Sequence, residues 1–184
     1  MANKVKYGIS NVYYALATDN GQGVLTYGNP VAMPGARSLS LEAQGETTPW
    51  YADNIIYYTS NSNNGYQGDF ELAMLPDSFR KDILGEVEDQ NGLLVEKADA
   101  STKEFALLFQ FEGDDKAIKH CLYRCTATRP AVSASTKEEN VEPQTDTITI
   151  TAMPRINDHV VKCKCGDGAT GYATFFDAVV EPNF

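Results

Sequence analysis

The sequence has few of the residues that catalysis usually needs. It contains two histidines in 184 residues, His120 and His159, although histidine is the most frequent general base. No Walker-type phosphate loop, G-x-S-x-G elbow or H-E-x-x-H motif occurs. Both histidines lie in or beside strand-like segments, so we interpret them as solvent-facing residues rather than as a catalytic base. We therefore expect no enzyme activity and assign no catalytic residue.

Long hydrophobic runs and an excess of positive charge are also missing. No apolar stretch is long enough to span a membrane, and the N-terminal segment lacks the apolar stretch of a secretory signal. We therefore expect the chain to start in a cytoplasm, with no membrane partner. The net charge is −10, and residues 42–100 hold 12 acidic and 3 basic side chains. Such a surface repels nucleic acid, which disfavours specific DNA binding but suits a conduit along which DNA slides.

Cysteine is scarce, with four residues at positions 121, 125, 163 and 165. On a regular strand Cys121 and Cys125 share a face, and so do Cys163 and Cys165, which allows a Cys₄ zinc site as one interpretation. The C-x₃-C and C-x-C spacings differ from the C-x₂-C pairs that such sites use. We favour buried thiols in a reducing compartment, with no metal or cofactor. A disulfide between neighbouring strands is left open.

The acidic residues form no recognisable ion site or acid–base pair. Gly166-Asp167-Gly168 has part of a calcium loop but lacks the full D-x-[DN]-x-[DN]-G pattern, so it predicts a plain turn. Asp114 and Asp115 lie at the tip of an expected hairpin, where solvent surrounds them. A glycosidase would need two carboxylates fixed across a cleft, an arrangement that the sequence leaves open.

Strand signals dominate what is present. Period-two alternation and β-branched or aromatic residues predict strands at 24–33 (broken at Asn29-Pro30), 37–43, 54–60, 69–75, 103–112, 116–128, 146–152, 159–165 and 171–180. Asn64-Gly65 predicts a hairpin turn between the strands at 54–60 and 69–75, and Asn91-Gly92 predicts another turn. Strands of this number and spacing predict a mainly β fold, a β-sandwich or barrel.

The centre of the core is predicted in the segment 103–112. There the large side chains fall on one face of the strand at period two, and they are Phe105, Leu107, Phe109 and Phe111. This face is the longest run of large apolar residues in the chain at that spacing. We therefore expect it to pack against the opposite layer of the fold.

One short helix is predicted at about residues 76–84. Pro76 suits its first position, Asp77 suits its positive N-terminal end, and Gly85 suits the left-handed position after its end. Phe79 and Ile83 are four residues apart and face the same way, so we expect them to pack on the sheet. We interpret this helix as a plug over an open barrel end.

The segment 43–54, AQGETTPWYADN, is the longest stretch near the acidic half without a period. Surface segments of this size tend to carry contacts. The aromatic residues in and near it are Trp50, Tyr51, Tyr57, Tyr58 and Tyr66. They suit either a sugar-stacking platform or the centre of a protein–protein interface. The lack of a secretion signal favours the interface.

Several segments, taken in order, carry a resemblance to a known family. They are YGISNVYYA (7–15), YGNPVAMPGARSLSLEA (27–43), YADN (51–54), GDFELAMLPDSFRKDILG (68–85), NGLLVE (91–96), FALLFQFEGDDKAIKHCLYRCTATRP (105–130), TDTITITAMPR (145–155) and ATFFDAVVEP (173–182). Through their order and spacing, the chain resembles the major tail proteins, or tail tube proteins, of long-tailed non-contractile bacteriophages. The resemblance covers nearly the whole chain, but no single motif is diagnostic and the cysteines are not a family hallmark.

The resemblance implies a structural virion protein. Such proteins form hexameric rings that stack into the tail tube, and genome DNA passes through the lumen without specific binding. For this chain it implies one tail-tube domain over 1–184, a β-sandwich with one flanking helix, terminal arms at about 1–10 and 178–184, and an inter-ring loop at about 42–66. The implied partners are other copies of the chain and the tape-measure, tail terminator and distal tail proteins. The implied location is the virion tail, after the host cytoplasm.

By position, the ring-stacking contacts implied by the resemblance are Glu46, Trp50, Tyr51, Asp53 and Tyr66. The alternative function is a carbohydrate-binding or hydrolytic β-sandwich of a phage or cell-surface assembly. Polymerisation that depends on concentration favours the tube protein. Saccharide binding that is lost with Trp50 favours the alternative.

Overall fold

The computed structural model describes residues 3–136 and 143–183. Its elements are β1 (Lys6–Asp19), β2 (Leu25–Tyr27), β3 (Val31–Ala32), β4 (Ala36–Gln44), β5 (Thr47–Ala52), β6 (Ile55–Asn61), β7 (Gly65–Leu72), α1 (Asp77–Phe79), the π-helical turn η1 (Arg80–Leu84), β8 (Val87–Glu88), β9 (Leu94–Val95), β10 (Phe105–Gly113), β11 (Ile118–Ala127), β12 (Asp146–Ala152) and β13 (Lys162–Cys165). The predicted mainly β fold with one short helix is confirmed.

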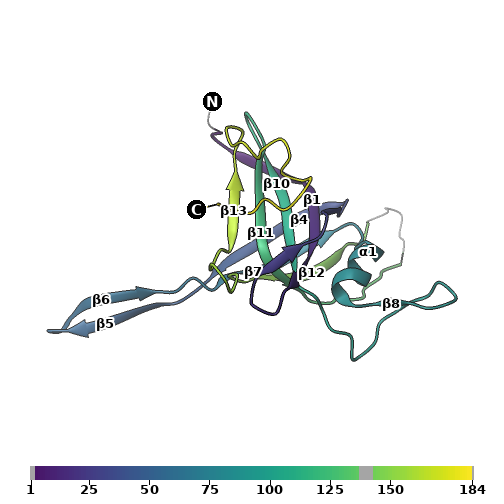
Figure 1. Cartoon of the computed structure of the whole chain (residues 1–184), viewed down its shortest axis with the longest axis horizontal. Coiled ribbons are helices and arrows are strands. Elements are labelled where there is room, and N and C mark those ends of the chain that lie inside the picture. Colours follow the sequence, from purple (N-terminus) through teal and green to yellow (C-terminus); the bar gives the residue numbers. More distant parts are fainter. Residues whose placement is uncertain (1–2, 137–142, 184) are drawn as a thin grey trace.

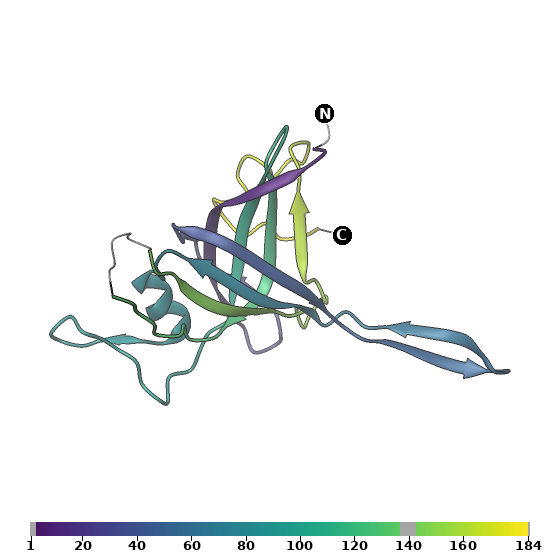
Figure 2. The ribbon, with the colours of Figure 1, turned by 180° about the vertical axis from the view of Figure 1, so that it is seen from behind.

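A nine-stranded antiparallel sheet forms the body of the molecule. Its order is β2-β1-β10-β11-β12-β7-β4, with β3 added to β1 and β13 added to β11. The sheet curves so that β4 and β7 lie across β10 and β11. Figures 1 and 2 show this arrangement from opposite sides. This arrangement gives the two layers of a β-sandwich. Two short hairpins, β5-β6 and β8-β9, lie outside the sheet.

The main core lies between the two layers. Phe105 and Leu107 of β10 are fully buried there, Phe109 is 5% exposed, and Phe111 packs against the edge of the same cluster. Burial of each such side chain contributes about 1.5–3 kcal/mol. The alternate residues of β10 are buried on the other face, where Leu108 and its neighbours lie beneath the C-terminal segment. Strand β10 is therefore covered on both faces.

The helix lies at the Phe105 end of β10. Phe79 of α1 and Ile83 of η1 are fully buried, and the Phe79 ring meets Phe105 edge-on with 5.3 Å between centroids. The hydroxyl of Tyr14 donates a hydrogen bond to Asp82 Oδ2 at 2.8 Å, which links the helix to β1. Gly85 ends the helix with φ of 77°, a left-handed conformation that glycine adopts without strain.

The predicted strand at 171–180 is wrong. These residues form successive turns, in which Phe175 is buried and other apolar side chains are partly buried. Phe175 is fully buried against the outer face of β10 and β11, and Tyr172, Phe176 and Val179 pack around it. The apolar residues of this segment thus pack on the face of a sheet, and the segment is not itself a strand. Periodicity does not distinguish these two cases over such a short run.

The predicted hairpin turn at Asn64-Gly65 is also wrong. Strand β6 pairs with β5, whereas β7 pairs with β4 and β12. The turn lies earlier, at Asp53 and Asn54, whose φ angles are 51° and 61°. Positive φ at both central residues is what a two-residue type I′ hairpin requires, and Asp and Asn tolerate it better than most residues.

Candidate functional site

The most exposed feature of the molecule is a hairpin that extends away from the sheet (Figures 1 and 2). We call residues 45–64 the arm; it contains β5 and β6, which pair only with each other. Gln44 of β4 lies opposite Gly65 of β7, so the arm leaves and rejoins the sheet at one rung. At about 3.3 Å per residue, the stretch from Gly45 to Asp53 spans on the order of 25 Å.

Backbone hydrogen bonds fix the direction of the arm at its base. The amide of Asn64 donates to the Gln44 carbonyl at 2.8 Å, and the amide of Ser62 donates to the Glu46 carbonyl at 2.9 Å. A side chain at Gly45 would place its Cβ 2.1 Å from the Ser62 carbonyl oxygen, so only glycine fits there. The antiparallel ladder of β4 and β7 therefore continues into the arm with a local irregularity, not through a free linker.

Large apolar side chains cover the arm. Their exposed fractions range from 56% to 68%, and they are Trp50, Tyr51, Ile55, Ile56, Tyr57 and Tyr58. Trp50 packs edge-on against Tyr57, with 6.0 Å between ring centroids. A lone two-stranded hairpin is marginally stable in water, and contiguous exposed apolar patches mark interaction surfaces. The arm is therefore a candidate contact surface, whose large apolar side chains are exposed in the isolated chain.

A second candidate surface is an opening between the two layers of the sandwich. We call it the hollow; it measures about 250 Å³ and is lined by Lys6, Leu39, Leu41, Tyr66, Phe109, Phe111, His120, Leu122 and Lys162. Along β10 the helix covers the end near Phe105, whereas the hollow lies at the end near Phe111. One end of the sandwich is thus closed by a helix and the other is open.

The hollow is apolar inside and positively charged at its rim. The Lys6 Nζ lies 4.9 Å from the Phe111 ring centroid, and the Lys162 Nζ lies 4.2 Å from that of Tyr66. His120 stacks on Phe109 with 5.4 Å between centroids, so the expectation that His120 faces solvent is wrong. Burial and the charges of the nearby lysines lower the pKa of His120 to about 4, which leaves it neutral at pH 7.

The outward faces of β4, β7 and β12 form a polar, acidic surface. The Thr149 hydroxyl donates to Asp69 at 2.9 Å, and the Thr145 hydroxyl donates to Glu71 at 2.6 Å. Arg37 forms an ion pair with Glu71 at 2.7 Å. The hydrogen bond from Thr145, and then those from Ser38 and Arg37 with the Arg37 charge, lower the pKa of Glu71. Both carboxylates are therefore held in place by hydrogen bonds, and the lowered pKa of Glu71 favours its ionised form.

A comparison with protein families assigns the chain. Residues 2–164 match the family described as phage tail tube protein. The chain belongs to the phage tail tube family. The resemblance recognised in the sequence is thereby confirmed, and the chain is a structural protein of the virion tail that self-assembles into a tube. A search of curated proteins found no match.

The structure separates the predicted contact residues of this tail tube protein into two groups. Glu46, Trp50, Tyr51 and Asp53 lie on the arm, with Asp53 in its terminal turn. Tyr66 lies instead in β7, where it lines the hollow. Strand β5 was not predicted from the sequence, because Pro49 and the polar residues before it mask the alternation. The signal that could have located this hairpin is the dipeptide Asp53-Asn54, because both residue types favour tight turns. It was not used in the prediction.

Other polar residues of the tail tube protein serve its structure. The Asp114 carboxylate accepts a hydrogen bond from the Lys4 amide at 2.8 Å, which holds the N-terminal segment against the β10-β11 turn. The predicted turn at 166–168 is confirmed, and Asp167 lies 3.8 Å from Lys116. Gly166, Gly168 and Gly171 also have G-x-G-x-x-G spacing, which sequence analysis overlooked. Turns follow them rather than the helix that a dinucleotide fingerprint requires.

The cysteines lie on two sides of the sheet. Cys121 is opposite Cys163 in the β11-β13 ladder, whereas Cys125 belongs to the main core. The expectation that Cys121 and Cys125 share a face is wrong, because a register irregularity lies between the Phe105 and Leu107 rungs. All four thiols are free. Burial raises the pKa of Cys121, and a hydrogen bond with Cys121 lowers the pKa of Cys163.

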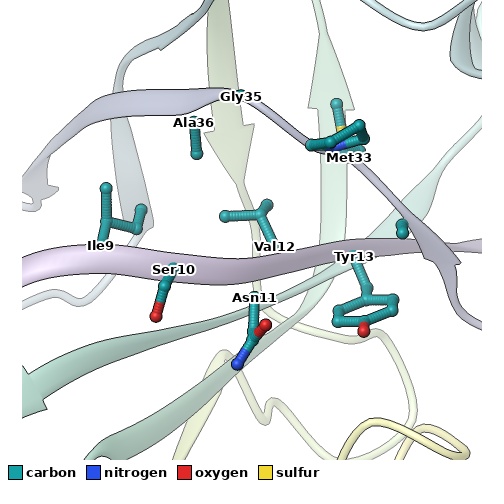
Figure 3. A pocket seen from close by; sticks show the side chains of 10 residues that line it. Ile9, Ser10, Asn11, Val12, Tyr13, Met33, Gly35 and Ala36 are labelled. Atoms are coloured by element: carbon teal, nitrogen blue, oxygen red, sulfur yellow. The ribbon is translucent and has the colours of Figure 1, made fainter.

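Strand β1 carries a second pocket, of about 340 Å³ (Figure 3). Ile9 and Val12 point toward the segment around Gly35, whereas Ser10 and Asn11 point to the other side (Figure 3). The register of β1 shifts between Ser10 and Tyr13, and Asn11 has φ of 49°. The lining contains no carboxylate, histidine, lysine or cysteine. We interpret the pocket as the seam between β1 and the start of β4.

The described residues also contain no helix with the length and apolar character of a membrane span. His159 is exposed, as expected, but it lies outside the strands, with φ of 59°. Its amide donates to the Arg155 carbonyl at 3.1 Å, so it closes a turn before β13. Neither histidine is therefore arranged as the solvent-facing strand residue that sequence analysis expected.

Proposed function

We propose that this tail tube protein forms hexameric rings that stack into the tube through which the genome is ejected. The observation that carries the proposal is the arm, whose large apolar side chains are more than half exposed in the isolated chain. Exposure on this scale is unfavourable unless another molecule covers it. A stacked assembly of identical rings would cover every arm except those at one end of the tube.

The arm is the part of the predicted loop at 42–66 that we assign to inter-ring contact. We keep Glu46, Trp50, Tyr51 and Asp53 as stacking residues because they lie on the arm itself. Residues 42–44 belong to β4 and residues 65–66 to β7, so they support the arm rather than extend with it. Tyr66 would contribute from the hollow.

We propose the outward face of β4, β7 and β12 as the lining of the lumen. Its carboxylates Asp69 and Glu71 are fixed by hydrogen bonds, and Arg37 is paired with Glu71. Like charges on the wall and on DNA would prevent binding during passage. This charge pattern supports a conduit without specific DNA contacts.

We propose residues 1–184 as one tail-tube domain. The C-terminal segment supports this, because the Tyr123 hydroxyl donates to the Val180 carbonyl at 2.7 Å and Arg155 pairs with Glu181. The described parts of the N-terminal and C-terminal segments thus lie on the subunit's own sheet. We propose that they contact neighbouring subunits from this position. At the tube ends, tail terminator and distal tail proteins would cover the remaining surfaces, and a tape-measure protein would occupy the lumen. The host cytoplasm is the proposed location before assembly.

Deletion of the arm tests the proposal. We expect replacement of residues 46–61 by an Asn-Gly turn to abolish rings and tubes in negative-stain electron microscopy, across a concentration series in which the wild type assembles. The free energy of unfolding should stay near that of the wild type, because the arm adds little to the core. Normal tubes from the deletion variant would contradict the proposal.

A glycan screen separates this function from the carbohydrate-binding alternative. The exposed Trp50 and Tyr57 rings would suit sugar stacking as well as protein contact. We expect no saccharide binding by the wild type. Binding that Trp50→Ala removes, in a protein that stays monomeric at every concentration, would support the alternative instead.

A further inference from the structure

We propose that the tip of the arm docks in the hollow of a second copy of the chain. In this contact, Tyr51 and Ile56 face the apolar floor and Asp53 faces Lys6 and Lys162 at the rim. The inference rests on the proposed ring stacking and names the surface that receives the arm. It therefore assigns the hollow, which so far has no role, as the receptor site of the assembly.

The arm cannot fill the hollow of its own subunit. Leu41 and Tyr66 line the hollow, and they lie within a few rungs of the arm's base at Gln44 and Gly65. The arm then leads away from the sheet for roughly 25 Å (Figures 1 and 2). Its tip is thus separated from its own hollow by the length of the arm, and the occupant must come from another copy.

The hollow and the arm tip are complementary in shape and polarity. A volume of about 250 Å³ admits individual large side chains but not a folded hairpin. Leu39, Leu41 and Phe111 are half-buried, so the hollow leaves apolar surface open. The tip offers Tyr51 and Ile56, each more than half exposed. Docking would remove both surfaces from water, which is favourable at about 25 cal/mol per Å² of apolar area.

The charges of the two surfaces are opposite. Within residues 45–64 the charged side chains are Glu46 and Asp53, both acidic. At the hollow, Lys6 and Lys162 point over aromatic rings, and in the described chain neither forms an ion pair with a carboxylate. A positive site in a chain of net charge −10 suits an acidic segment of another copy. Charge complementarity of this kind sets the orientation and register of a contact.

The contact also has the symmetry that a tube needs. The arm and the hollow are different surfaces, so an arm-to-hollow contact is heterologous. Each copy would give its arm to one neighbour and receive the arm of another. A contact of this type closes into a ring when its rotation returns to the first copy, and it gives linear growth when each copy is displaced along an axis. Ring stacking along a tube is growth of that kind.

Photo-crosslinking tests the contact directly. The full-length chain carries p-benzoylphenylalanine in place of Tyr51 and is mixed with isotope-labelled wild type at concentrations at which the wild type assembles. Mass spectrometry then identifies peptides linked between light and heavy copies. We expect crosslinks to segments that line the hollow, from β1, β4, β7, β10, β11 or β13. Crosslinks confined to other surfaces, or none between copies, would overturn the inference.

The same experiment separates the inference from the proposed function. Tubes whose crosslinks map away from the hollow would leave the ring-stacking function intact and refute only the hollow as receptor. If the wild type forms no assembly at any concentration and the variant with p-benzoylphenylalanine gives no crosslink to it, both would be refuted. A sample containing p-benzoylphenylalanine in place of Val132, which is fully exposed on the body, reports non-specific crosslinking.

Charge exchange gives a second test that does not require a probe. We expect Lys162→Asp and Asp53→Lys each to raise the concentration needed for assembly by about tenfold or more. The double variant, which restores opposite charges, should recover most of the loss. Lys97→Asp makes the same change at an exposed lysine beyond β9 and serves as the control. An equal effect of Lys97→Asp, or no recovery in the double variant, would contradict the contact.

Discussion

The body of the sandwich and the arm use the same kinds of residue in opposite ways. Large side chains of β10 are at most 5% exposed from Phe105 to Phe109, whereas those of β5 and β6 are 56% to 68% exposed. Both regions are antiparallel β structure with aromatic and β-branched residues. The apolar residues of the body therefore stabilise the subunit, whereas we propose that those of the arm contact another copy. Stability and assembly should therefore vary independently.

The largest effect on stability is expected from the body. Phe105→Ala removes a fully buried ring that meets Phe79 of the helix, and we expect it to destabilise the subunit by about 3–5 kcal/mol. Urea unfolding followed by circular dichroism measures the change. Val132→Ala, at a fully exposed position, is the control and should be nearly neutral. A loss below about 1 kcal/mol for Phe105→Ala would mean that the core does not depend on this face.

We expect a pH effect of intermediate size on stability from His120, which lines the hollow where the two regions are proposed to meet. His120 has its pKa lowered from 6.5 to about 4 by burial and by nearby lysines. Between these two values the unfolded chain binds a proton that the folded chain does not, so stability falls as pH decreases through this window. Because the ring is partly exposed, we expect a loss of about 1 kcal/mol rather than the full value of the shift.

The measurement for His120 compares urea unfolding at pH 7 and pH 4.5. His120→Leu removes the titrating group, so we expect the variant to lose less stability than the wild type over the same interval. Carboxylates titrate in both proteins and cancel in the difference. Equal pH dependence in the two proteins would show that His120 is not the group responsible.

Regular alternation predicted several strands of the body, although β1, the longest strand, was not predicted. The face of Phe105 to Phe111, the strands at 146–152 and 37–43, and the helix between Pro76 and Gly85 all appear close to their predicted positions. In these segments the local pattern and the tertiary packing agree, because the large side chains predicted to lie on one face do pack together in the main core. The break at Asn29-Pro30 also falls between β2 and β3, since proline cannot donate to a central ladder.

The arm and the hollow were harder to predict, for physical reasons. In β5, Pro49 interrupts the run of strand-forming residues that made β6 recognisable, although both strands are exposed. The hollow joins residues far apart in sequence, such as Lys6, Tyr66 and Lys162, through pairings that no local pattern specifies. A register irregularity opposite Phe105 and Leu107 also reverses the side to which Cys125 points, and such irregularities have no reliable sequence signal.

A small effect on stability is expected from the arm. Trp50→Ala should change the free energy of unfolding by no more than about 0.5 kcal/mol, because its ring is mostly exposed and contacts only the arm. The same variant should assemble poorly at concentrations at which the wild type forms tubes. Urea unfolding and negative-stain microscopy of one preparation give both results. A large destabilisation with normal tubes would contradict this prediction, because it would show that Trp50 stabilises the subunit and is not needed for assembly.

The smallest effect is expected when a metal chelator is added, which tests whether the body needs an ion. Cys121, Cys163 and Cys165 lie on one side of the sheet and Cys125 on the other, so the four thiols do not surround one point. Burial also raises the pKa of Cys121 and Cys125, which disfavours the thiolate that binds metal. We expect the melting temperature with and without EDTA to be the same. Because a structural zinc ion contributes folding energy outright, a fall of many degrees would show that the body is held by metal as well as by its core.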